Sequence, residues 1–338
     1  MENNNEVLVD VQDLHVQFYL HEGTVHALEG VSFQILQGKT LGVIGESGSG
    51  KSVTAQAIMG IIPNPPGKVT GGRVLLNLPK NGAGLQVVNV TELPPSGAEI
   101  RHIRGKEVSM IFQEPMTSFS PVHTLGDQIM EAIQIHYPEV GKREARDRTI
   151  QMMRRVGIPR PEERVDAYPF QFSGGMRQRA MIAMALVCNP RLVIADEPTT
   201  ALDVTIEAQI LELLKDLQAE FGMSIMYISH DLTVVGGIAD EVVVMYLGLV
   251  MEQAATNELF DNPLHPYTES LWRSIPTIDG DLERLTPIRG TLPSPFAVHN
   301  GCPFYSRCEK RIPGVCDAAR PPMVEARPRH WVRCFLYA

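Results

Sequence analysis

A glycine-rich loop that ends in Lys-Ser is the first group of residues in this chain that could do chemistry. Residues 45–52 read Gly-Glu-Ser-Gly-Ser-Gly-Lys-Ser and fit the pattern G-x-x-x-x-G-K-[ST]. Glycines let the backbone curl so that several N–H groups point at one anion. Lys51 would supply a charge to the β- and γ-phosphates of a nucleotide, and Ser52 a hydroxyl ligand for Mg²⁺. The residues expected to bind phosphate are Gly45, Ser47, Gly48, Ser49, Gly50, Lys51 and Ser52.

Two carboxylates at the end of an apolar run form a second candidate site. Residues 192–197 read Leu-Val-Ile-Ala-Asp-Glu, and ligands bind at the carboxyl ends of strands in open parallel sheets. Asp196 is expected to hold Mg²⁺ through water, because this cation prefers oxygen ligands. Glu197 could polarise an attacking water molecule. An acidic turn would explain the pair alone, but the phosphate loop earlier in the chain favours a catalytic role.

Four cysteines gather near the C-terminus with the spacing C-x5-C-x7-C-x17-C. Four thiolates suit zinc or an iron–sulfur cluster. The surrounding segment is rich in glycine and proline and has little apolar core of its own, so a metal centre could replace the missing burial. The candidate ligands are Cys302, Cys308, Cys316 and Cys334.

The remaining cysteine and two nearby histidines have simpler interpretations. Structural disulfides are not expected in a cytosolic chain, and Cys188 is expected to be a small buried apolar residue. His265 and His330 could ligate a metal, but we expect each to be a turn residue.

Alternating apolar runs and amphipathic segments must position these residues, and they predict an α/β fold with a mostly parallel sheet. Helices are expected over 51–62, 174–187 and 206–221, with a helical insertion from 124 to about 167, and a surface loop over 79–98. After about residue 256, proline becomes frequent and an appendage begins. The expected strands are 7–11, 14–19, 31–36, 41–45, 108–112, 192–195 and 224–229, with further strands in 242–251.

Length and composition exclude several classes of protein. The 338 residues predict about two domains, and 44% hydrophobic with 20% charged residues is typical of a globular chain. A net charge of −9 argues against a nucleic-acid partner. No apolar stretch reaches the length of a membrane span, and the first residues lack the features of a signal peptide. A cytoplasmic chain is therefore expected.

Residues 172–179, Phe-Ser-Gly-Gly-Met-Arg-Gln-Arg, resemble the L-S-G-G-Q signature of the ATP-binding-cassette (ABC) ATPases. The resemblance implies that Ser173, Gly174 and Gly175 cap the γ-phosphate of ATP held by a partner subunit, so that two cassettes enclose two nucleotides. The sequence departs from the signature at Phe172 and Met176. The serine and both glycines are intact, so the site is expected to work.

Other positions resemble the family in order along the chain. Gln113 matches the Q-loop glutamine, which senses Mg²⁺ and the attacking water, and residues 201–203, Ala-Leu-Asp, match the D-loop that ends at Asp203. His230 matches the switch histidine that contacts the γ-phosphate. Phe18 matches the aromatic residue that stacks on adenine, with Tyr19 as the alternative one residue later.

Three further stretches resemble the oligopeptide, dipeptide and nickel importer group: residues 112–118, residues 196–205 and the Asn-Pro-Leu-His-Pro-Tyr-Thr of 262–268. The resemblance implies an α/β P-loop NTPase cassette over 7–255, with a mixed sheet core, an antiparallel β subdomain and a helical subdomain at about 120–188. It also implies a small, irregular, Cys-rich extension over 256–338. Members of the group carry a [4Fe–4S] cluster on cysteines at these positions, with Zn²⁺ as the alternative.

The resemblance implies an ATPase that powers a membrane importer for peptides or similar small solutes. Its expected partners are a second, similar ATPase in a heterodimer, two permease subunits, and an extracytoplasmic binding protein. Each permease would dock near residues 113–120, and the chain would lie at the cytoplasmic face of the cell membrane. Import of oligosaccharides or nickel, and action on nucleic acid, are the alternatives. A GTPase would need an N-K-x-D motif, which the sequence lacks.

Overall fold

The computed structural model describes residues 6–80, 84–113, 118–199, 203–274, 288–297 and 300–338. The chain separates into two compact units. Unit 1 comprises residues 1–35, 40–91 and 228–338, and unit 2 comprises residues 36–39 and 92–227. The expected division at residue 255 stays a prediction. Within the described ranges, every helix is too short or too polar to cross a bilayer.

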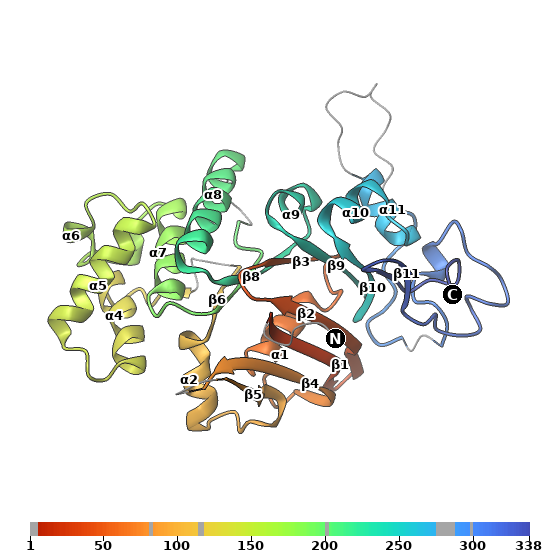
Figure 1. The fold of residues 1–338 in the computed structure, drawn as a ribbon, viewed down its shortest axis with the longest axis horizontal. Helices are drawn as coiled ribbons and strands as arrows, with labels where there is room; N and C mark the ends of the chain where they lie inside the picture. Colours follow the sequence, from red (N-terminus) through yellow and green to blue (C-terminus); the bar gives the residue numbers. More distant parts are fainter. Residues whose placement is uncertain (1–5, 81–83, 114–117, 200–202, 275–287, 298–299) are drawn as a thin grey trace. The chain divides into compact units, whose positions relative to one another are not determined.

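Unit 1 contains an antiparallel sheet and a mixed set of strands (Figure 1). The antiparallel sheet has the order β2-β1-β4-β5, and the mixed set has the order β11-β12-β10-β9-β3. In the mixed set, β3 and β9 are parallel, while β10, β12 and β11 follow antiparallel. The strands are β1 (Val7–Leu20), β2 (Gly23–Leu36), β3 (Thr40–Ile44), β4 (Gly67–Pro79), β5 (Leu85–Asn89), β9 (Glu241–Tyr246), β10 (Leu249–Ala255), β11 (Val324–Arg327) and β12 (His330–Val332).

The core of unit 1 lies around β3 and β9. All five residues of β3 are buried, as are all but the first of β9, which is the pattern of strands covered on both faces. The helical segments of this unit are α1 (Lys51–Ile58), α9 (Leu232–Ile238), α10 (Thr256–Asp261), α11 (Pro266–Arg273) and the 3₁₀ turn η3 (Tyr305–Arg307), and a further 3₁₀ turn, η1 (Val90–Glu92), lies where the chain passes into unit 2.

Unit 2 contains a short parallel pair of strands, β6 and β7, and a group of helices that lies between these two strands in the chain (Figure 1). Its expected helical insertion is present as α4, α5 and α6. Thr124 caps α4, because its Oγ1 accepts a hydrogen bond from the backbone N–H of Asp127 at 3.1 Å. The elements are α2 (Ala98–Lys106), β6 (Val108–Ile111), α4 (Leu125–His136), α5 (Lys142–Arg155), α6 (Pro161–Arg164), η2 (Pro169–Gln171), α7 (Gly174–Leu186), β7 (Leu192–Asp196), α8 (Val204–Phe221) and β8 (Ser224–Ser229), the last of which enters unit 1 after Tyr227.

Two predicted strands at the start of the chain are one strand. β1 runs through the expected break, with a bulge where its register to β4 shifts between Gln12 and His15. Asp13 adopts a left-handed φ of 46° there, and a Cβ on the facing Gly72 would lie 2.2 Å from the Asp13 carbonyl oxygen. Residues 12–13 therefore form a bulge that only looks like a turn in the sequence.

Two other predicted boundaries are wrong for identifiable reasons. α1 ends at Ile58 rather than residue 62, because Gly60 adopts φ 65° and its N–H bonds back to the Ala57 carbonyl. Residues 79–98 are not all loop, since β5 pairs with β4 and buries Val88. The two strands expected in 242–251 are confirmed as β9 and β10, joined through Leu247 and Gly248, both at positive φ.

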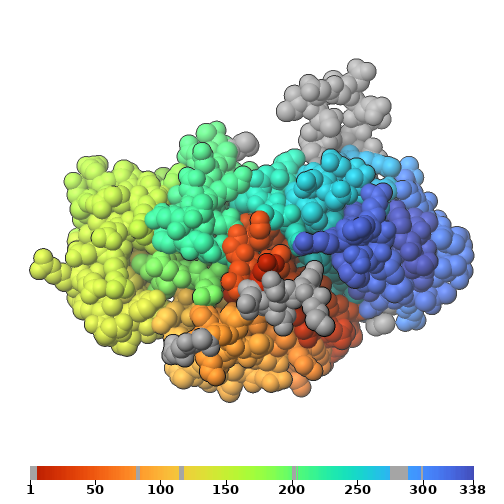
Figure 2. Space-filling model, viewed as in Figure 1, coloured from red at the N-terminus to blue at the C-terminus, as the bar shows by residue number. Residues whose placement is uncertain are grey.

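The residues after β10 pack onto it through a buried carboxylate. Glu252 on β10 has no exposed surface and accepts hydrogen bonds from the backbone N–H groups of Leu264 and His265, at 2.7 and 2.9 Å. His330 on β12 lies 2.7 Å from Glu252 through its Nε2. In the space-filling view, the blue C-terminal residues lie against the cyan residues of β10 and α11 (Figure 2).

Glu252→Ala is expected to lower the free energy of unfolding by about 3–5 kcal/mol, because it leaves buried N–H groups without an acceptor. Urea denaturation of the purified chain would measure the loss. Glu258→Ala is the matched control, since the Glu258 carboxylate makes only exposed, long contacts among the described residues: an ion pair with Arg327 at 4.0 Å and a hydrogen bond from Asn262 at 3.4 Å. Its effect is expected to stay below about 0.5 kcal/mol. Equal losses in the two variants would contradict this account.

Candidate functional site

The loop after β3 has the backbone of an anion cradle. Gly45, Gly48 and Gly50 adopt positive φ values of 153°, 79° and 102°, which favour glycine. A Cβ at Gly45 would lie 2.2 Å from the Met245 carbonyl oxygen, and one at Gly50 would lie 2.9 Å from the Ala27 carbonyl oxygen. Side chains are thus excluded where the loop turns into α1, as the motif requires.

Two polar side chains of the loop are buried. Lys51 is 5% exposed, and its Nζ donates to the carbonyl oxygens of Gly45 and Glu46 at 2.7 and 3.1 Å. Ser49 is 2% exposed, and its Oγ has no hydrogen-bond partner among the described residues. Ser52 follows on the exposed side of α1. A buried ammonium, an unsatisfied hydroxyl and a curled backbone together fit a phosphate ligand.

The two candidate aromatic residues on β1 point in different directions. Phe18 is half-buried, and its ring approaches Gly67 so closely that a Cβ there would lie 2.7 Å from it. Tyr19 is 52% exposed and donates its hydroxyl to Gln17 at 3.0 Å. Which ring stacks on adenine stays a prediction.

In unit 2, the acidic pair and the glutamine come together at one end of adjacent parallel strands. β6 and β7 pair in parallel, so Gln113 and Glu197 both follow carboxyl ends. The Gln113 Nε2 donates to a Glu197 carboxylate oxygen at 3.2 Å. Asp196 is 7% exposed, and Glu197 adopts a left-handed φ of 46°. Strained backbone of this kind is frequent at functional sites.

Only part of the expected D-loop lies among the described residues. Ala201 and Leu202 lie outside the described residues, as do residues 114–117 of the Q-loop. Asp203 is exposed and precedes α8, and its carbonyl oxygen accepts from the Glu207 N–H at 2.9 Å.

The expected signature begins a helix, as predicted. Ser173 caps α7, and its Oγ accepts from the Met176 N–H at 3.4 Å. Apart from its chain neighbours and the backbone of its own helix, no described atom lies within 4 Å of where a Cβ on Gly174 would stand. Glycine in a helix costs about 1 kcal/mol relative to alanine, so the packing of unit 2 does not explain this residue. An open glycine at a helix start suits the close approach of another molecule.

The two residues that differ from the signature, Phe172 and Met176, both contact Arg164. The guanidinium carbon of Arg164 lies 5.7 Å from the centre of the Phe172 ring, and its Nη1 lies 3.8 Å from the Met176 sulfur. Phe172 is 3% exposed and fills a buried apolar position, as the usual leucine would. Both substitutions are therefore accommodated by local packing.

His230, in unit 1, follows β8 and is exposed. Asp231 caps α9 directly after it and accepts from the Thr233 N–H at 2.8 Å. The histidine thus stands at the carboxyl end of a buried strand, where the sequence predicted it.

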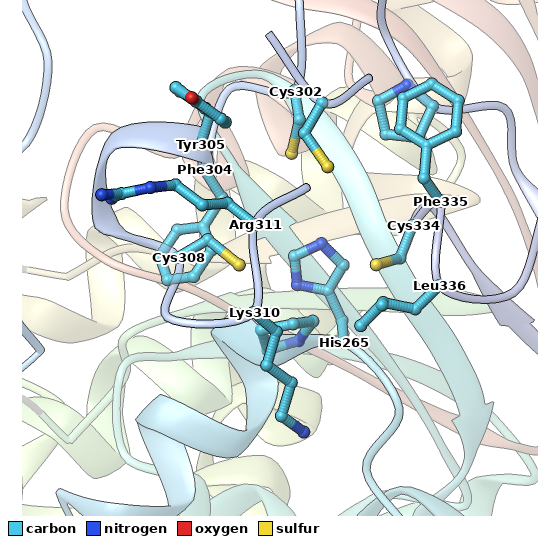
Figure 3. Close-up of a pocket in the computed structure, with 13 residues that line it drawn as sticks. His265, Cys302, Phe304, Tyr305, Cys308, Lys310, Arg311, Cys334, Phe335 and Leu336 are labelled. Atoms are coloured by element: carbon cyan, nitrogen blue, oxygen red, sulfur yellow. The ribbon is translucent and has the colours of Figure 1, made fainter. Parts of the chain in front are cut away.

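All four C-terminal cysteines line one narrow pocket, with a volume of about 10 Å³. Figure 3 shows the sulfurs of Cys302, Cys308 and Cys334 on its walls, with the His265 ring beside them. The Cys302 N–H donates to the Cys316 carbonyl oxygen at 2.7 Å, which ties the fourth cysteine to the first.

The pocket holds the thiols in an apolar environment. Burial raises the pKa of Cys302 to about 12 and raises the pKa values of Cys308 and Cys334. Among the described residues, no group of three or more His, Cys, Asp or Glu side chains is close enough to hold a single metal ion. The other cysteine is buried as predicted, and burial raises the pKa of Cys188 to about 11. All five cysteines are free thiols.

The prediction of a turn residue is confirmed for His265, which lies between α10 and α11, and is wrong for His330, which lies in β12. Both are 1% exposed. His265 caps α11 by accepting the Tyr267 N–H at its Nδ1, at 2.9 Å, and burial lowers its pKa to about 4. His330 binds the buried Glu252. The buried partner, far away in sequence, is what the local pattern could not indicate.

Sequence reasoning also missed contacts between the loop and the C-terminal segment. The Glu46 N–H donates to the Tyr267 hydroxyl at 2.9 Å, and Arg307 donates to both Glu46 carboxylate oxygens at 2.5 and 2.9 Å. The only signal was a charged residue inside a glycine-rich loop, which does not identify its partner.

Family models match two parts of the chain. A model described as "ABC transporter" matches residues 28–200. A model described as "Oligopeptide/dipeptide transporter, C-terminal region" matches residues 251–316.

Curated proteins match nearly the whole chain. The dipeptide transport ATP-binding protein DppD of Bacillus subtilis is 47% identical over 98% of this chain and 95% of its own length. The oligopeptide transport ATP-binding protein AppD of the same organism is 47% identical, over 98% and 97%. The oligopeptide transport ATP-binding protein OppD of Escherichia coli is 42% identical, over 98% and 93%.

Solved structures match the larger part of the fold. The dimeric post-hydrolysis structure of the ATP-binding cassette MJ0796, bound to ADP and Pi, has a TM-score of 0.62 and 26% identity. It covers 74% of this chain and 99% of its own. CbiO1 of Clostridium perfringens, part of an ABC transporter complex, has a TM-score of 0.60 and 26% identity over 76% and 92%.

Proposed function

Since the chain belongs to the ABC transporter family, we propose that it is the ATP-hydrolysing subunit of a membrane importer for peptides or similar small solutes. The observation that carries the proposal is the phosphate cradle of Gly45–Ser52, in a chain that also has the peptide-transporter C-terminal region. Relatives named for dipeptide and oligopeptide transport support the choice of solute.

The phosphate loop binds the nucleotide through backbone N–H groups and Lys51. The ammonium of Lys51 exchanges its bonds to loop carbonyls for phosphate oxygens, and Ser52 provides a hydroxyl to Mg²⁺. Phe18 stacks on the adenine, with Tyr19 as the alternative. When bound, Mg²⁺ neutralises phosphate charge; Asp196 and Gln113 are the other residues proposed to hold it.

We expect hydrolysis to use three side chains that follow the carboxyl ends of β6, β7 and β8. Glu197 acts as general base on the attacking water, and Gln113, which already donates to its carboxylate, orients that water. His230 contacts the γ-phosphate.

Two cassettes share each nucleotide. Ser173, Gly174 and Gly175 at the start of α7 cap the γ-phosphate on a partner subunit, and Asp203 lies at the same interface. Support comes from the open space beside Gly174 and from the start of a helix as an anion site. We propose a second, similar ATPase as the partner in a heterodimer.

We propose that a permease docks near residues 113–120, at a groove of about 540 Å³ in unit 2 that includes Ser120. The groove lies along α4 and is lined by residues from Ser120 to Lys142. A short permease helix here would connect nucleotide-driven closure to transport. Two permeases and an extracytoplasmic binding protein complete the proposed importer, with this chain peripheral at the cytoplasmic face of the membrane.

The division proposed along the chain is a cassette over 7–255, with a helical subdomain at about 120–188, and an extension over 256–338. In the extension, we propose a [4Fe–4S] cluster on Cys302, Cys308, Cys316 and Cys334. Four thiols around one pocket are the donor set that such clusters use. When bound, the cluster would supply four metal–thiolate bonds that cross-link these turns.

Lys51→Ala is expected to weaken ATP binding roughly a hundredfold, because charge-assisted bonds to phosphate are lost. Fluorescence titration with an ATP analogue would measure the dissociation constant. Lys215→Ala, on the exposed face of α8, is the control and keeps wild-type affinity. Unchanged affinity in Lys51→Ala would refute the phosphate-loop assignment.

Glu197→Gln is expected to keep ATP binding while lowering turnover by about 10²- to 10⁴-fold, the usual contribution of a general base. Phosphate release measures turnover, and size-exclusion chromatography with ATP is expected to show a trapped dimer. Glu212→Gln, exposed on α8, leaves both unchanged. Full hydrolysis by Glu197→Gln would show that another group is the base.

Anaerobically purified protein is expected to contain about four iron and four acid-labile sulfide per chain. Cys308→Ser is expected to lose most of this iron, whereas Cys188→Ser, which changes the cysteine outside the pocket, retains it. Elemental analysis and thiolate-to-iron absorbance are the measurements. Stoichiometric zinc without sulfide would overturn the cluster.

A further inference from the structure

Every polar group of one phosphate-loop residue, Glu46, is engaged by another side chain or by the loop itself. Its N–H donates to the Tyr267 hydroxyl at 2.9 Å. Its carbonyl oxygen accepts from Lys51 Nζ at 3.1 Å and from the Ser49 N–H at 3.1 Å. Its carboxylate receives two bonds from Arg307. Two of these partners come from the C-terminal segment, more than 200 residues later in the chain.

Burial and further hydrogen bonds also fix the position of the Arg307 side chain. Its side chain is 4% exposed. Its Nη1 also donates to the Tyr246 hydroxyl at 3.3 Å, and its Nε donates to the Arg289 carbonyl oxygen at 3.0 Å. The hydrogen bonds to the Glu46 carboxylate, and after them the one to Tyr246, raise the pKa of the Arg307 guanidinium above its usual value. Because a bidentate arginine–carboxylate pair has a fixed geometry, the position of the Arg307 guanidinium determines the position of the Glu46 carboxylate.

An aromatic cluster and the cysteine pocket fix the segment that delivers Arg307. Phe304, 1% exposed, packs against the Tyr246 and Tyr267 rings at centroid distances of 5.4 and 5.3 Å. Cys302 and Cys308, which flank this segment, both line the pocket. Arg307 thus reaches the loop from a short arch that is anchored at both ends.

The position of Glu46 matters because the glycines around it allow the loop backbone many conformations. Gly45 and Gly48 adopt positive φ values, and glycine has more backbone freedom to lose on ordering than any other residue. The Tyr267 hydroxyl also fixes the direction of the Glu46 N–H. Ordering this residue in advance lowers the entropy cost of wrapping the loop around a phosphate group.

We propose that Arg307, acting through Glu46, is a positioning residue of the phosphate loop, so that the C-terminal segment contributes to nucleotide affinity. The inference rests on the proposed nucleotide binding at Gly45–Ser52. Arg307 does not touch the nucleotide, so its effect is on the shape of the cradle. That cradle encloses the phosphate groups that ATP and ADP share.

The test measures dissociation constants for ATP and ADP on the purified full chain. Arg307→Met is expected to raise both by roughly tenfold and in parallel. Arg307→Lys, which keeps the charge but loses the fork, is expected to fall in between. Glu46→Gln is the second variant, in case Arg307→Met does not fold. Combining it with Arg307→Met is expected to add little, because the two act as one unit.

Arg329 and Glu241 provide a matched control. They form another ion pair between the C-terminal segment and the sheet, at 2.5 Å. Glu241 lies opposite Leu41 at the start of β9, the far end of the strands from the loop. Arg329→Met and Glu241→Gln are expected to leave both dissociation constants at the wild-type value.

The outcomes separate this inference from the proposed function. Wild-type protein that binds no ATP would refute the proposed function itself. Wild-type binding with unchanged constants in folded Arg307→Met or Glu46→Gln, judged by an intact thermal transition, would refute the positioning role alone. A shift in thermal midpoint without a change in either constant would likewise show a merely structural pair.

Discussion

A buried carboxylate on β10 determines where the later part of the chain can go. Glu252 has no exposed surface, so it is tolerated only because N–H groups surround it. Two of them belong to the turn at Leu264 and His265, which starts α11 and so brings Tyr267 to the phosphate loop. The His330 ring lies 2.7 Å from the same carboxyl group through its Nε2, and β12, which carries it, pairs with β10. One buried carboxyl group thus organises both a helix start and a strand pairing.

Much of the fold could be predicted because its signals are local. The apolar runs of β3, β6, β7 and β8 and the caps of α4 and α7 are readable within a few residues. The errors arose where a distant contact, or a backbone conformation that the sequence does not specify, decides the outcome. Asp13 looked like the end of a strand, and only the backbone of Gly72 opposite shows that it is a bulge. The lone positive φ of Gly60, which ends α1, has no signature that separates it from other helical glycines.

The candidate site also has parts that were predictable from local sequence and parts that were not. The phosphate loop and the Asp196-Glu197 pair were predictable, because glycine, lysine and carboxylate chemistry at strand ends has few other uses. The gathering of four cysteines around one pocket agrees with their grouping in the sequence. The burial of His265 and His330 was not predictable, since a histidine beside a proline or an arginine is usually exposed. Glu46 and Arg307 were beyond reach for a simpler reason: no local pattern pairs residues 261 positions apart.

The pairing of β12 with β10 limits how this protein could have been assembled or trimmed during evolution. β10 carries the buried Met251 and Ala254 and pairs with β12 at Glu252 and Gln253. A chain that stopped after β10 would present that strand as an open edge, and open edges pair readily with other chains. Recombination that exchanged the C-terminal segment between relatives would therefore have to carry a compatible strand with it. The terminal segment is best regarded as part of the sheet it closes.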